Sequence, residues 1–215
     1  RFLNRLPGSI GMFMGLTGAT LNVADALRVG FADYAVPSNG FEELMGHLRE
    51  QIWSDSPATN DRHLLETLQS FAAEYQLDLS ESNLAHHEQF ISRICRGRDV
   101  VAVVNTILNT SAESEWFQAA QDNLRNGCPV SAHIVFEQLH RGLQQSLRDI
   151  FVMELTVAVH CARHRDFLEG VRARLIDKDH APRWTHKDVA SVPAGWIRSH
   201  FTPPWPEDEH PLRDL

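Results

Sequence analysis

Two histidines and a glutamate in the last third of the chain come closest, by type and spacing, to a catalytic or metal-binding site. His160 and His164 lie four residues apart, so a helix would place both imidazoles on one face, as zinc sites require. No glutamate stands between them as in the H-E-x-x-H motif, and no third ligand follows at a diagnostic distance. We therefore interpret them as surface or hydrogen-bonded histidines and predict no metal site.

Glu154 interrupts an otherwise apolar stretch, IFVMELTVAV, which predicts a helix buried on most sides. A buried carboxylate must be paired, hydrogen-bonded or protonated. Two interpretations stay open: a general base with a raised pKa, or a structural tie to an arginine or a helix N-terminus. We favour the structural tie, because perturbed carboxylates also occur in structural networks.

The chain shows no motif for a nucleophile. It has no G-x-S-x-G and no glycine-rich phosphate loop, and Cys95, Cys128 and Cys161 lack a convincing basic partner. The odd number of cysteines and the absence of C-x-x-C spacing argue against a disulfide framework and favour a reducing compartment. Judged by its own residues, the chain does not contain a complete active site.

Composition excludes some partners. The chain has 215 residues, of which 43% are hydrophobic and 22% charged, as in ordinary soluble globular proteins. Its formal net charge of −8 argues against a nucleic-acid partner, because phosphate binding needs clustered positive charge. The most apolar stretch, residues 150–162, is interrupted and too short to span a bilayer, so we expect no membrane partner.

Periodicity predicts a mostly α chain with one short strand near residues 31–36, ended by Pro37. Asn22 is the expected N-cap of a helix that ends at Gly30. A lone strand leaves backbone groups unpaired, so we expect a partner strand from a part of the protein preceding Arg1. The other predicted helices cover residues 9–17, 40–53, 62–74, 86–95, 99–109 and 114–126, and two or three long helices cover 131–178.

Two blocks of sequence resemble one superfamily. LTGATLNVADALRVGFADYAVPS resembles the L-T-G-x-x-L-x-x-x-D-A-L-x-x-G-L-A-x-x-x-V-P-S element of the crotonase (enoyl-CoA hydratase/isomerase) superfamily. The later block, from Cys128 to Trp184, is similar to the C-terminal region of its 3-hydroxyisobutyryl-CoA hydrolase branch. There Q-L-x-x-G, M-E, D-F-x-E-G-V-R-A-x-L-I-D-K-D and P-x-W recur in this order. His133, where the hydrolases often carry lysine, and Cys128 depart from the pattern.

The resemblance implies the C-terminal helical half of a crotonase-like α/β (ββα spiral) fold. On this basis residues 1–38 end the crotonase-like core, 39–128 form a helical segment, 129–202 a C-terminal helical cap, and 203–215 a proline-rich acidic tail. The implied parent is an enzyme, an acyl-CoA thioester hydrolase acting on 3-hydroxyisobutyryl-CoA in valine breakdown. The alternatives are an enoyl-CoA hydratase or isomerase on another acyl-CoA, and a catalytically inactive helical interaction module.

The resemblance also implies where the site lies. The catalytic residues are expected upstream of Arg1, so none is carried over and this chain alone is expected to be inactive. Phe13 and Leu16 are implied to face the acyl pocket, with core packing as the alternative. Lys178 is implied to approach the CoA, although a lysine near a helix C-terminus is also explained by the helix dipole.

The implied partners follow from the same resemblance. They are an acyl-CoA substrate, the crotonase core that would precede Arg1, and a second copy if the protein is a homo-oligomer. CoA is part of the substrate, so no cofactor is expected. The expected location is a bacterial cytoplasm, or the mitochondrial matrix if the source is a eukaryote. The stretch EGVRARLIDKD, residues 169–179, carries the branch-specific signal. It is predicted to be an amphipathic helix end, with Phe167, Leu168, Val171 and Leu175 facing the core and Glu169 paired to Arg172 on the outside.

Overall fold

The computed structural model describes residues 1–75 and 79–214, and no described residue lies in a β-strand. The chain divides into two compact units, one made of residues 1–20 and 87–215 and the other of residues 21–86. We describe each unit by itself. The four segments expected from the resemblance are a separate division and stay a prediction.

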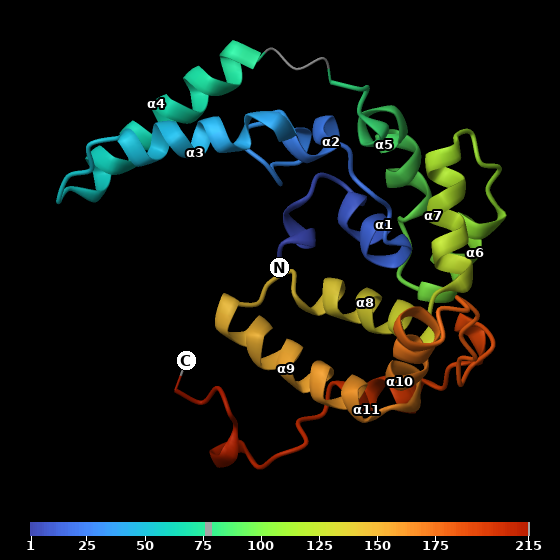
Figure 1. The fold of residues 1–215 in the computed structure, drawn as a ribbon. Helices are drawn as coiled ribbons and strands as arrows, with labels where there is room; N and C mark the ends of the chain where they lie inside the picture. The colour runs from blue at the N-terminus through green and yellow to red at the C-terminus, as the bar shows by residue number, and fades with distance from the viewer. Residues whose placement is uncertain (76–78, 215) are drawn as a thin grey trace. The chain divides into compact units, whose positions relative to one another are not determined.

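The first unit is organised around α1 (Ile10–Thr17), a short helix that is apolar on nearly all sides (Figure 1). Ile10 and Phe13 have no exposed surface. Gly11 is needed here because a Cβ at this position would lie 2.0 Å from the carbonyl oxygen of Leu3, in the preceding turn. Gly18 ends the helix in the left-handed conformation, with φ of 60°.

The remaining helices of the first unit pack around and beyond α1. α1 contacts α7 (Glu115–Asn126) and α8 (Pro129–Arg141), while α9 (Leu147–Arg163) contacts α10 (Arg165–Val171) and α11 (Ala194–His200). A turn of π-helix, Arg172–Ile176, continues α10. The unit also holds η1 (Leu3–Arg5), α6 (Val100–Asn109), η4 (Val189–Ser191) and η5 (Glu207–Glu209).

A hydrophobic cluster joins the last helices of this unit. Side chains from α8, α9 and α11 meet those of the loop before α11, and the buried members are Val130, Ile134, Val157, Val192 and Ile197. The partly buried Cys128, Cys161 and Phe201 pack against this cluster. Burial of this kind is the main favourable term that holds amphipathic helices together.

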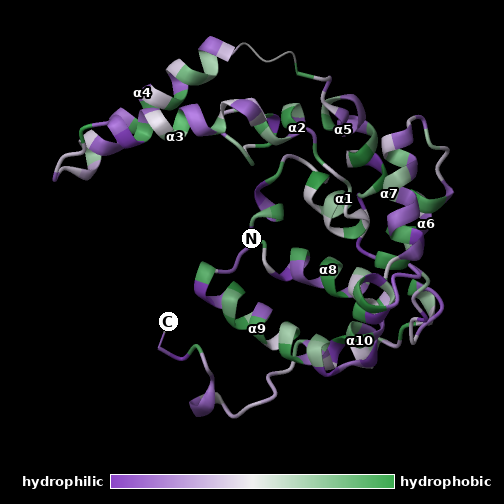
Figure 2. Cartoon of the chain, in the orientation of Figure 1, coloured by the Kyte–Doolittle hydropathy of each residue, from purple (hydrophilic) through white to green (hydrophobic). Residues whose placement is uncertain are grey.

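The second unit contains α2 (Val23–Arg28), η2 (Ser38–Gly40), α3 (Phe41–Glu50) and α4 (Pro57–Tyr75), and α5 (Asn83–Ile94) begins in it. Figure 2 shows hydrophobic and hydrophilic patches alternating along α3 and α4, as expected of amphipathic surface helices. The two helices pack against each other. The ring of Phe71 on α4 is buried 4.8 Å from that of Tyr75, measured between centroids, and the Tyr75 hydroxyl donates to Glu43 on α3.

The helices expected from the sequence are confirmed, and so is the N-cap expected at Asn22. Asn22 caps α2 and accepts a hydrogen bond from the backbone nitrogen of Asp25 at 2.8 Å. Gly30 adopts φ of 72°, as its position after α2 predicted. Asp99 and Ser114 cap the starts of α6 and α7. Local side-chain chemistry therefore defines the starts of these helices.

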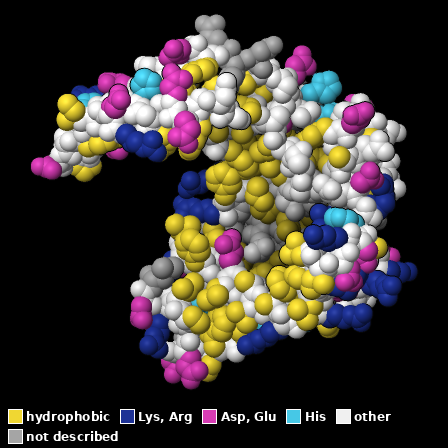
Figure 3. All heavy atoms as spheres, in the orientation of Figure 1, with side chains coloured by type: hydrophobic (Ala, Val, Ile, Leu, Met, Phe, Trp, Pro, Cys, Tyr) yellow, Lys and Arg dark blue, Asp and Glu magenta, His cyan; other side chains and the backbone are white. Residues whose placement is uncertain are grey.

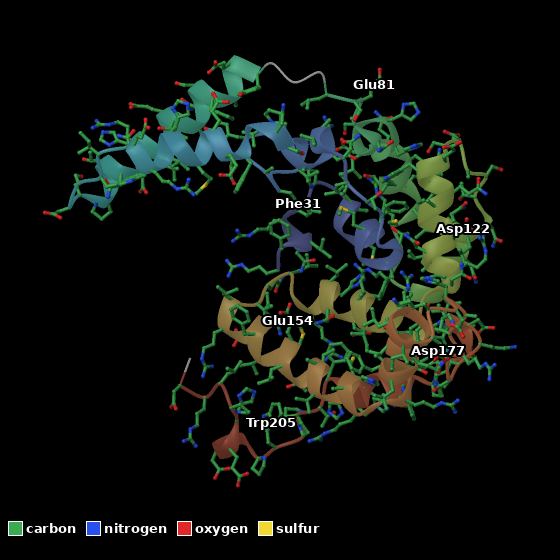
Figure 4. The ribbon with its side chains drawn as sticks, viewed as in Figure 1. Phe31, Glu81, Asp122, Glu154, Asp177 and Trp205 are labelled. Atoms are coloured by element: carbon green, nitrogen blue, oxygen red, sulfur yellow. The ribbon has the colours of Figure 1, made fainter. Side chains whose placement is uncertain are left out.

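The predicted strand at residues 31–36 is wrong. After α2 the chain makes bends and irregular structure until η2, and Phe31, labelled in Figure 4, lies at the start of this segment. The backbone nitrogens of Phe31 and Ala32 donate to the carbonyl oxygen of Ala26 in α2, at 2.8 and 3.3 Å. A strand needs a neighbouring strand to pair with, and the described residues provide none.

Asp25 is a fully buried carboxylate that ties α2 to the start of α5. Its Oδ1 accepts hydrogen bonds from the Ser82 hydroxyl at 2.7 Å and from the Leu84 backbone nitrogen at 2.8 Å. Its Oδ2 accepts from the Asn22 backbone nitrogen at 3.1 Å. A buried carboxylate is tolerated in such a place because several donors satisfy it.

We predict that Asp25→Ala lowers the free energy of unfolding by about 2–4 kcal/mol, because it leaves two buried backbone N–H groups and a hydroxyl without their acceptor. Urea unfolding followed by circular dichroism measures the change. The matched control is Asp33→Ala, since Asp33 is exposed. Equal unfolding midpoints for the two variants would show that the Asp25 contacts contribute nothing.

Candidate functional site

Phe13 and Leu16, the two residues implied to face an acyl pocket, lie in the interior of the first unit. Phe13 has no exposed surface, and its ring lies 5.6 Å from those of Trp116 and Phe117, measured between centroids. Leu16 is 7% exposed. Core packing accounts for both positions, and a role in binding an acyl group stays a prediction.

Lys178, the residue implied to approach CoA, lies in an exposed turn after the π-helix. Its backbone adopts φ of 54°, and His180, two residues later, adopts φ of 53°. These are the two described non-glycine residues with positive φ. Such backbone conformations are uncommon and costly for residues that carry a Cβ, and they cluster at functional sites.

One guanidinium holds this turn. Arg172 binds Glu169 through two hydrogen bonds, from Nη2 to Oε1 at 2.7 Å and from Nε to Oε2 at 3.0 Å. Its Nη1 contacts Oδ2 of Asp177 at 2.6 Å and Oδ2 of Asp179 at 2.7 Å. Asp177, labelled in Figure 4, directly follows the π-helix. The predicted Glu169–Arg172 pair is confirmed, and the two aspartates extend it to a four-residue network.

The network shifts the acidity of its members. The Arg172 hydrogen bonds, together with one from the Arg183 backbone nitrogen, lower the pKa of Glu169 to about 2. The Ala181 backbone nitrogen and Arg172 lower the pKa of Asp179. The carboxylates in turn raise the pKa of Arg172. Glu169, Asp179 and Arg172 therefore stay charged across the physiological pH range.

The apolar residues of α10 and the π-helix are not buried as the amphipathic pattern predicted. Phe167, Leu168 and Leu175 are 54%, 65% and 68% exposed, so the expectation that they face the core is wrong. Ala173 is the fully buried residue of this stretch. An amphipathic pattern identifies an apolar face, but it does not say which surface covers that face.

His160 lies on α9, whereas His164 follows the helix as its C-cap with an extended backbone, so the expected shared helix face is not formed. The fold brings a third histidine close to both. The His200 ring lies 4.5 Å from that of His164 and 5.9 Å from that of His160, measured between centroids. Nδ1 of His200 donates to the Trp196 carbonyl at 2.9 Å, and Nε2 of His160 donates to the Thr202 carbonyl at 2.8 Å. Within the described part of the chain no group of histidines, cysteines and carboxylates is arranged to hold a metal ion.

The imidazoles of His164 and His200 line an apolar cavity of about 390 Å³ in the first unit. This volume falls in the range of small-molecule sites. Its walls come from the ends of α8 and α9, from α10 and the π-helix, and from α11. The polar or aromatic lining residues that matter for chemistry are Cys128, Cys161, His164, Asp166, Arg174, Trp184, Trp196 and His200.

The two thiols in this cavity are poor nucleophiles. Burial raises the pKa of Cys128 and of Cys161, and it raises the pKa of Cys95, elsewhere in the unit, to about 12. Cys128 Sγ donates weakly to Asp166 at 3.6 Å. An acidic partner favours the thiol over the thiolate, so the structure offers no activated cysteine among the described residues.

Glu154 lies on the exposed side of α9, and the prediction that it is buried is wrong (Figure 4). The helix buries Ile150, Thr156 and Val157 instead. Glu154 borders a groove of about 370 Å³ whose other lining residues include Phe2, Leu147, Phe151 and Met153. Figure 3 shows hydrophobic side chains gathered over this region of α9. Because solvent reaches Glu154, its carboxylate does not require a cation partner within the protein.

Comparison with solved structures defines the class of protein. The chain superposes on an enoyl-CoA hydratase from Rhodobacter sphaeroides 2.4.1 with a TM-score of 0.72 and 28% identity, covering 94% of this chain and 54% of that one. A carnitinyl-CoA dehydratase from Mycobacterium thermoresistibile gives a TM-score of 0.74 and 25% identity, with the same coverage. The described helices therefore form part of a crotonase fold.

The sequence comparisons agree. A model of the enoyl-CoA hydratase/isomerase family matches residues 1–201, so the chain belongs to that family. It is 31% identical over 202 residues to the mitochondrial 3-hydroxyisobutyryl-CoA hydrolase of Danio rerio, covering 94% of this chain and 51% of that protein. The human protein of the same name is also 31% identical over 202 residues, covering 93% and 50%. The chain spans about half the length of these curated relatives.

The resemblance read from the sequence is thus confirmed at the level of the family and of the hydrolase-like branch. Among the described residues no helix is long and apolar enough to cross a membrane. The sequence pattern found the EGVRARLIDKD segment. It gave no sign of the positive φ angles in that segment or of His200 beside the other two histidines, because both depend on tertiary contacts.

We predict that His200 makes stability depend on pH. Burial lowers its pKa, and the neighbouring His164 and His160 lower it further. As the pH falls below about 6.5, the histidine of the unfolded chain takes up a proton before that of the folded chain does. The free energy of unfolding therefore decreases as the pH falls from about 6.5 to the lower pKa of the folded state. The loss is at most about 1.4 kcal/mol per pH unit.

Urea midpoints at pH 7.5 and 5.5 test this prediction. We expect the difference between the two midpoints to shrink in His200→Gln, whose side-chain amide can still donate to Trp196. The matched control is His47→Gln, an exposed histidine in the second unit. If His200→Gln keeps the full pH dependence of the unmodified chain, His200 is not its source.

We predict that the three thiols react slowly in the folded chain. Raising the pKa of Cys95 from about 9 to about 12 lowers its thiolate fraction about a thousandfold. Reaction with a colorimetric disulfide reagent at pH 8 should therefore be at least about a hundredfold slower at Cys95 than in the chain unfolded by guanidinium. Peptide mapping by mass spectrometry assigns each site. Rapid labelling of Cys95 in the folded chain would contradict the prediction.

Proposed function

We propose that this chain is part of an acyl-CoA thioester hydrolase that converts 3-hydroxyisobutyryl-CoA to 3-hydroxyisobutyrate and CoA in valine catabolism. The observation that carries the proposal is the similarity over 94% of the chain to proteins named 3-hydroxyisobutyryl-CoA hydrolase, together with the EGVRARLIDKD segment. We propose the mitochondrial matrix as the location if the source is a eukaryote, as in those relatives, and a bacterial cytoplasm otherwise.

In this proposal the chain supplies walls of the substrate site and not the reacting groups. Thioester hydrolysis in this superfamily depends on two backbone N–H groups that hold the oxyanion, a device that often provides the largest catalytic term. The described chain has no activated cysteine. We place the catalytic glutamate and the oxyanion donors outside this chain and assign Lys178 to the CoA moiety. CoA belongs to the substrate, and no cofactor is needed.

A second candidate is an enoyl-CoA hydratase or isomerase acting on another acyl-CoA. The similarity to a solved enoyl-CoA hydratase and a solved carnitinyl-CoA dehydratase supports it. Hydrolases and hydratases of one fold differ in the fate of the acyl group, which depends on a few placed side chains. A catalytically inactive helical module is the third candidate, and the 215-residue chain by itself is expected to behave as one.

Thioester assays decide between these candidates. The protein from the complete reading frame should release CoA from 3-hydroxyisobutyryl-CoA, detected with a thiol reagent, at least about tenfold faster than it hydrates crotonyl-CoA. The 215-residue chain alone should show no turnover with either substrate. Faster hydration of crotonyl-CoA would favour the hydratase, and inactivity of the complete protein toward both would favour the module. Turnover by the 215-residue chain would place a reacting group within it.

A further inference from the structure

Lys178 lies between two aspartates in the sequence but pairs with neither of them. It stands between Asp177 and Asp179, yet it forms no ion pair within the described residues, and its side chain is exposed. The other lysine of the chain behaves differently. Lys187 Nζ lies 3.8 Å from Oδ2 of Asp188, its neighbour in sequence. An adjacent aspartate can therefore reach a lysine in this protein, and something prevents it at Lys178.

Arg172 is the group that prevents it. Its Nη1 binds both flanking carboxylates, Asp177 at 2.6 Å and Asp179 at 2.7 Å. The other guanidinium nitrogens, Nε and Nη2, donate to Glu169, and Nη2 also donates to the Ala181 carbonyl at 3.3 Å. Charge-assisted bonds of this geometry are the strongest hydrogen bonds available to a carboxylate. The aspartates are thus held away from Lys178.

Backbone contacts fix the turn in the conformation that separates these groups. The Asp177 nitrogen donates to the Arg172 carbonyl at 2.8 Å, which closes the π-turn, and the His180 nitrogen donates to the Ala173 carbonyl at 3.1 Å. The Ala181 nitrogen donates to Asp179 Oδ1 at 2.9 Å. Positive φ at Lys178 and His180 persists only because these contacts outweigh its cost.

We propose that Arg172 is a positioning residue, which holds Asp177 and Asp179 and so leaves the Lys178 ammonium free to bind a phosphate group of the CoA thioester. The phosphate part of this inference rests on the function proposed above. A lysine ammonium recognises phosphate as a point charge, and it does so best when no carboxylate competes for it. Arg172 itself has no free face for an anion, because three carboxylates surround it.

Chemical labelling tests the positioning role without any ligand. Lys178 and Lys187 are the two lysines of the chain, so acetylation by sulfosuccinimidyl acetate, followed by peptide mass spectrometry, gives an internally controlled rate ratio. In Arg172→Gln the released aspartates pair with Lys178 and favour its charged, unreactive form. We expect the ratio of Lys178 to Lys187 labelling to fall at least about threefold.

A rescue variant separates positioning from unfolding. Adding Asp177→Asn and Asp179→Asn to Arg172→Gln removes the competing carboxylates, so the labelling ratio should return to the value of the unmodified chain. An unchanged ratio in Arg172→Gln overturns the proposal. So does a fallen ratio that the two asparagines do not restore, because the turn would then have lost its structure for another reason.

Kinetics of the protein from the complete reading frame test the phosphate. Lys178→Gln and Arg172→Gln should each raise KM for 3-hydroxyisobutyryl-CoA about tenfold with little change in kcat. Neither should affect the corresponding pantetheine thioester, which lacks phosphate. Combining the two changes should raise KM no further than Lys178→Gln alone, since Arg172 acts through Lys178. Lys187→Gln is the control and should leave KM unchanged.

The outcomes distinguish this inference from the proposed function. Hydrolysis of the CoA thioester with unchanged KM in both variants overturns the phosphate role and leaves the hydrolase intact. Equal losses on the CoA and pantetheine thioesters also overturn it. If the unmodified complete protein hydrolyses no acyl-CoA, the proposed function and the CoA assignment fail together, and the labelling ratio still decides whether Arg172 holds the aspartates.

Discussion

Burial of α1 is the constraint on which the first unit depends. This unit is discontinuous in sequence, because residues 1–20 pack with residues 87–215. Phe13 and Ile10 lose all contact with solvent, and α7 and α8 supply the surfaces that cover them. A helix apolar on nearly all sides has no stable exposed state, so it determines which later helices must come together. Gly11 allows the preceding turn to approach closely enough for this packing.

The turn around Lys178, unlike α1, is exposed to solvent. On the surface an isolated ion pair contributes little to stability. Here one guanidinium binds three carboxylates and the Ala181 carbonyl, and backbone nitrogens of the same turn donate to the Arg172 carbonyl and to Asp179. The result is a definite arrangement of charge around one lysine. Such ordering is what a binding element requires, because a ligand then need not order it.

Polar groups also line the apolar cavity formed by α8, α9, α10 and α11. His200 is buried and its Nδ1 donates to a carbonyl, and the two partly buried thiols stay protonated. Low polarity favours the neutral form of each group. His200 and the two thiols therefore offer neutral contacts to this cavity, whereas the turn formed by the π-helix and Asp177 to Ala181 is charged.

The sequence by itself determined the helices, their caps and the family. Asn22, Asp99 and Ser114 each cap a helix by accepting from a backbone nitrogen three residues later, and the Glu169–Arg172 pair spans one turn, so local spacing was enough. Tertiary structure alone decided that residues 31–36 form no strand, that Glu154 is exposed, and that Arg172 also holds Asp177 and Asp179. Strand pairing, burial and positive φ each depend on contacts that a periodic pattern cannot specify.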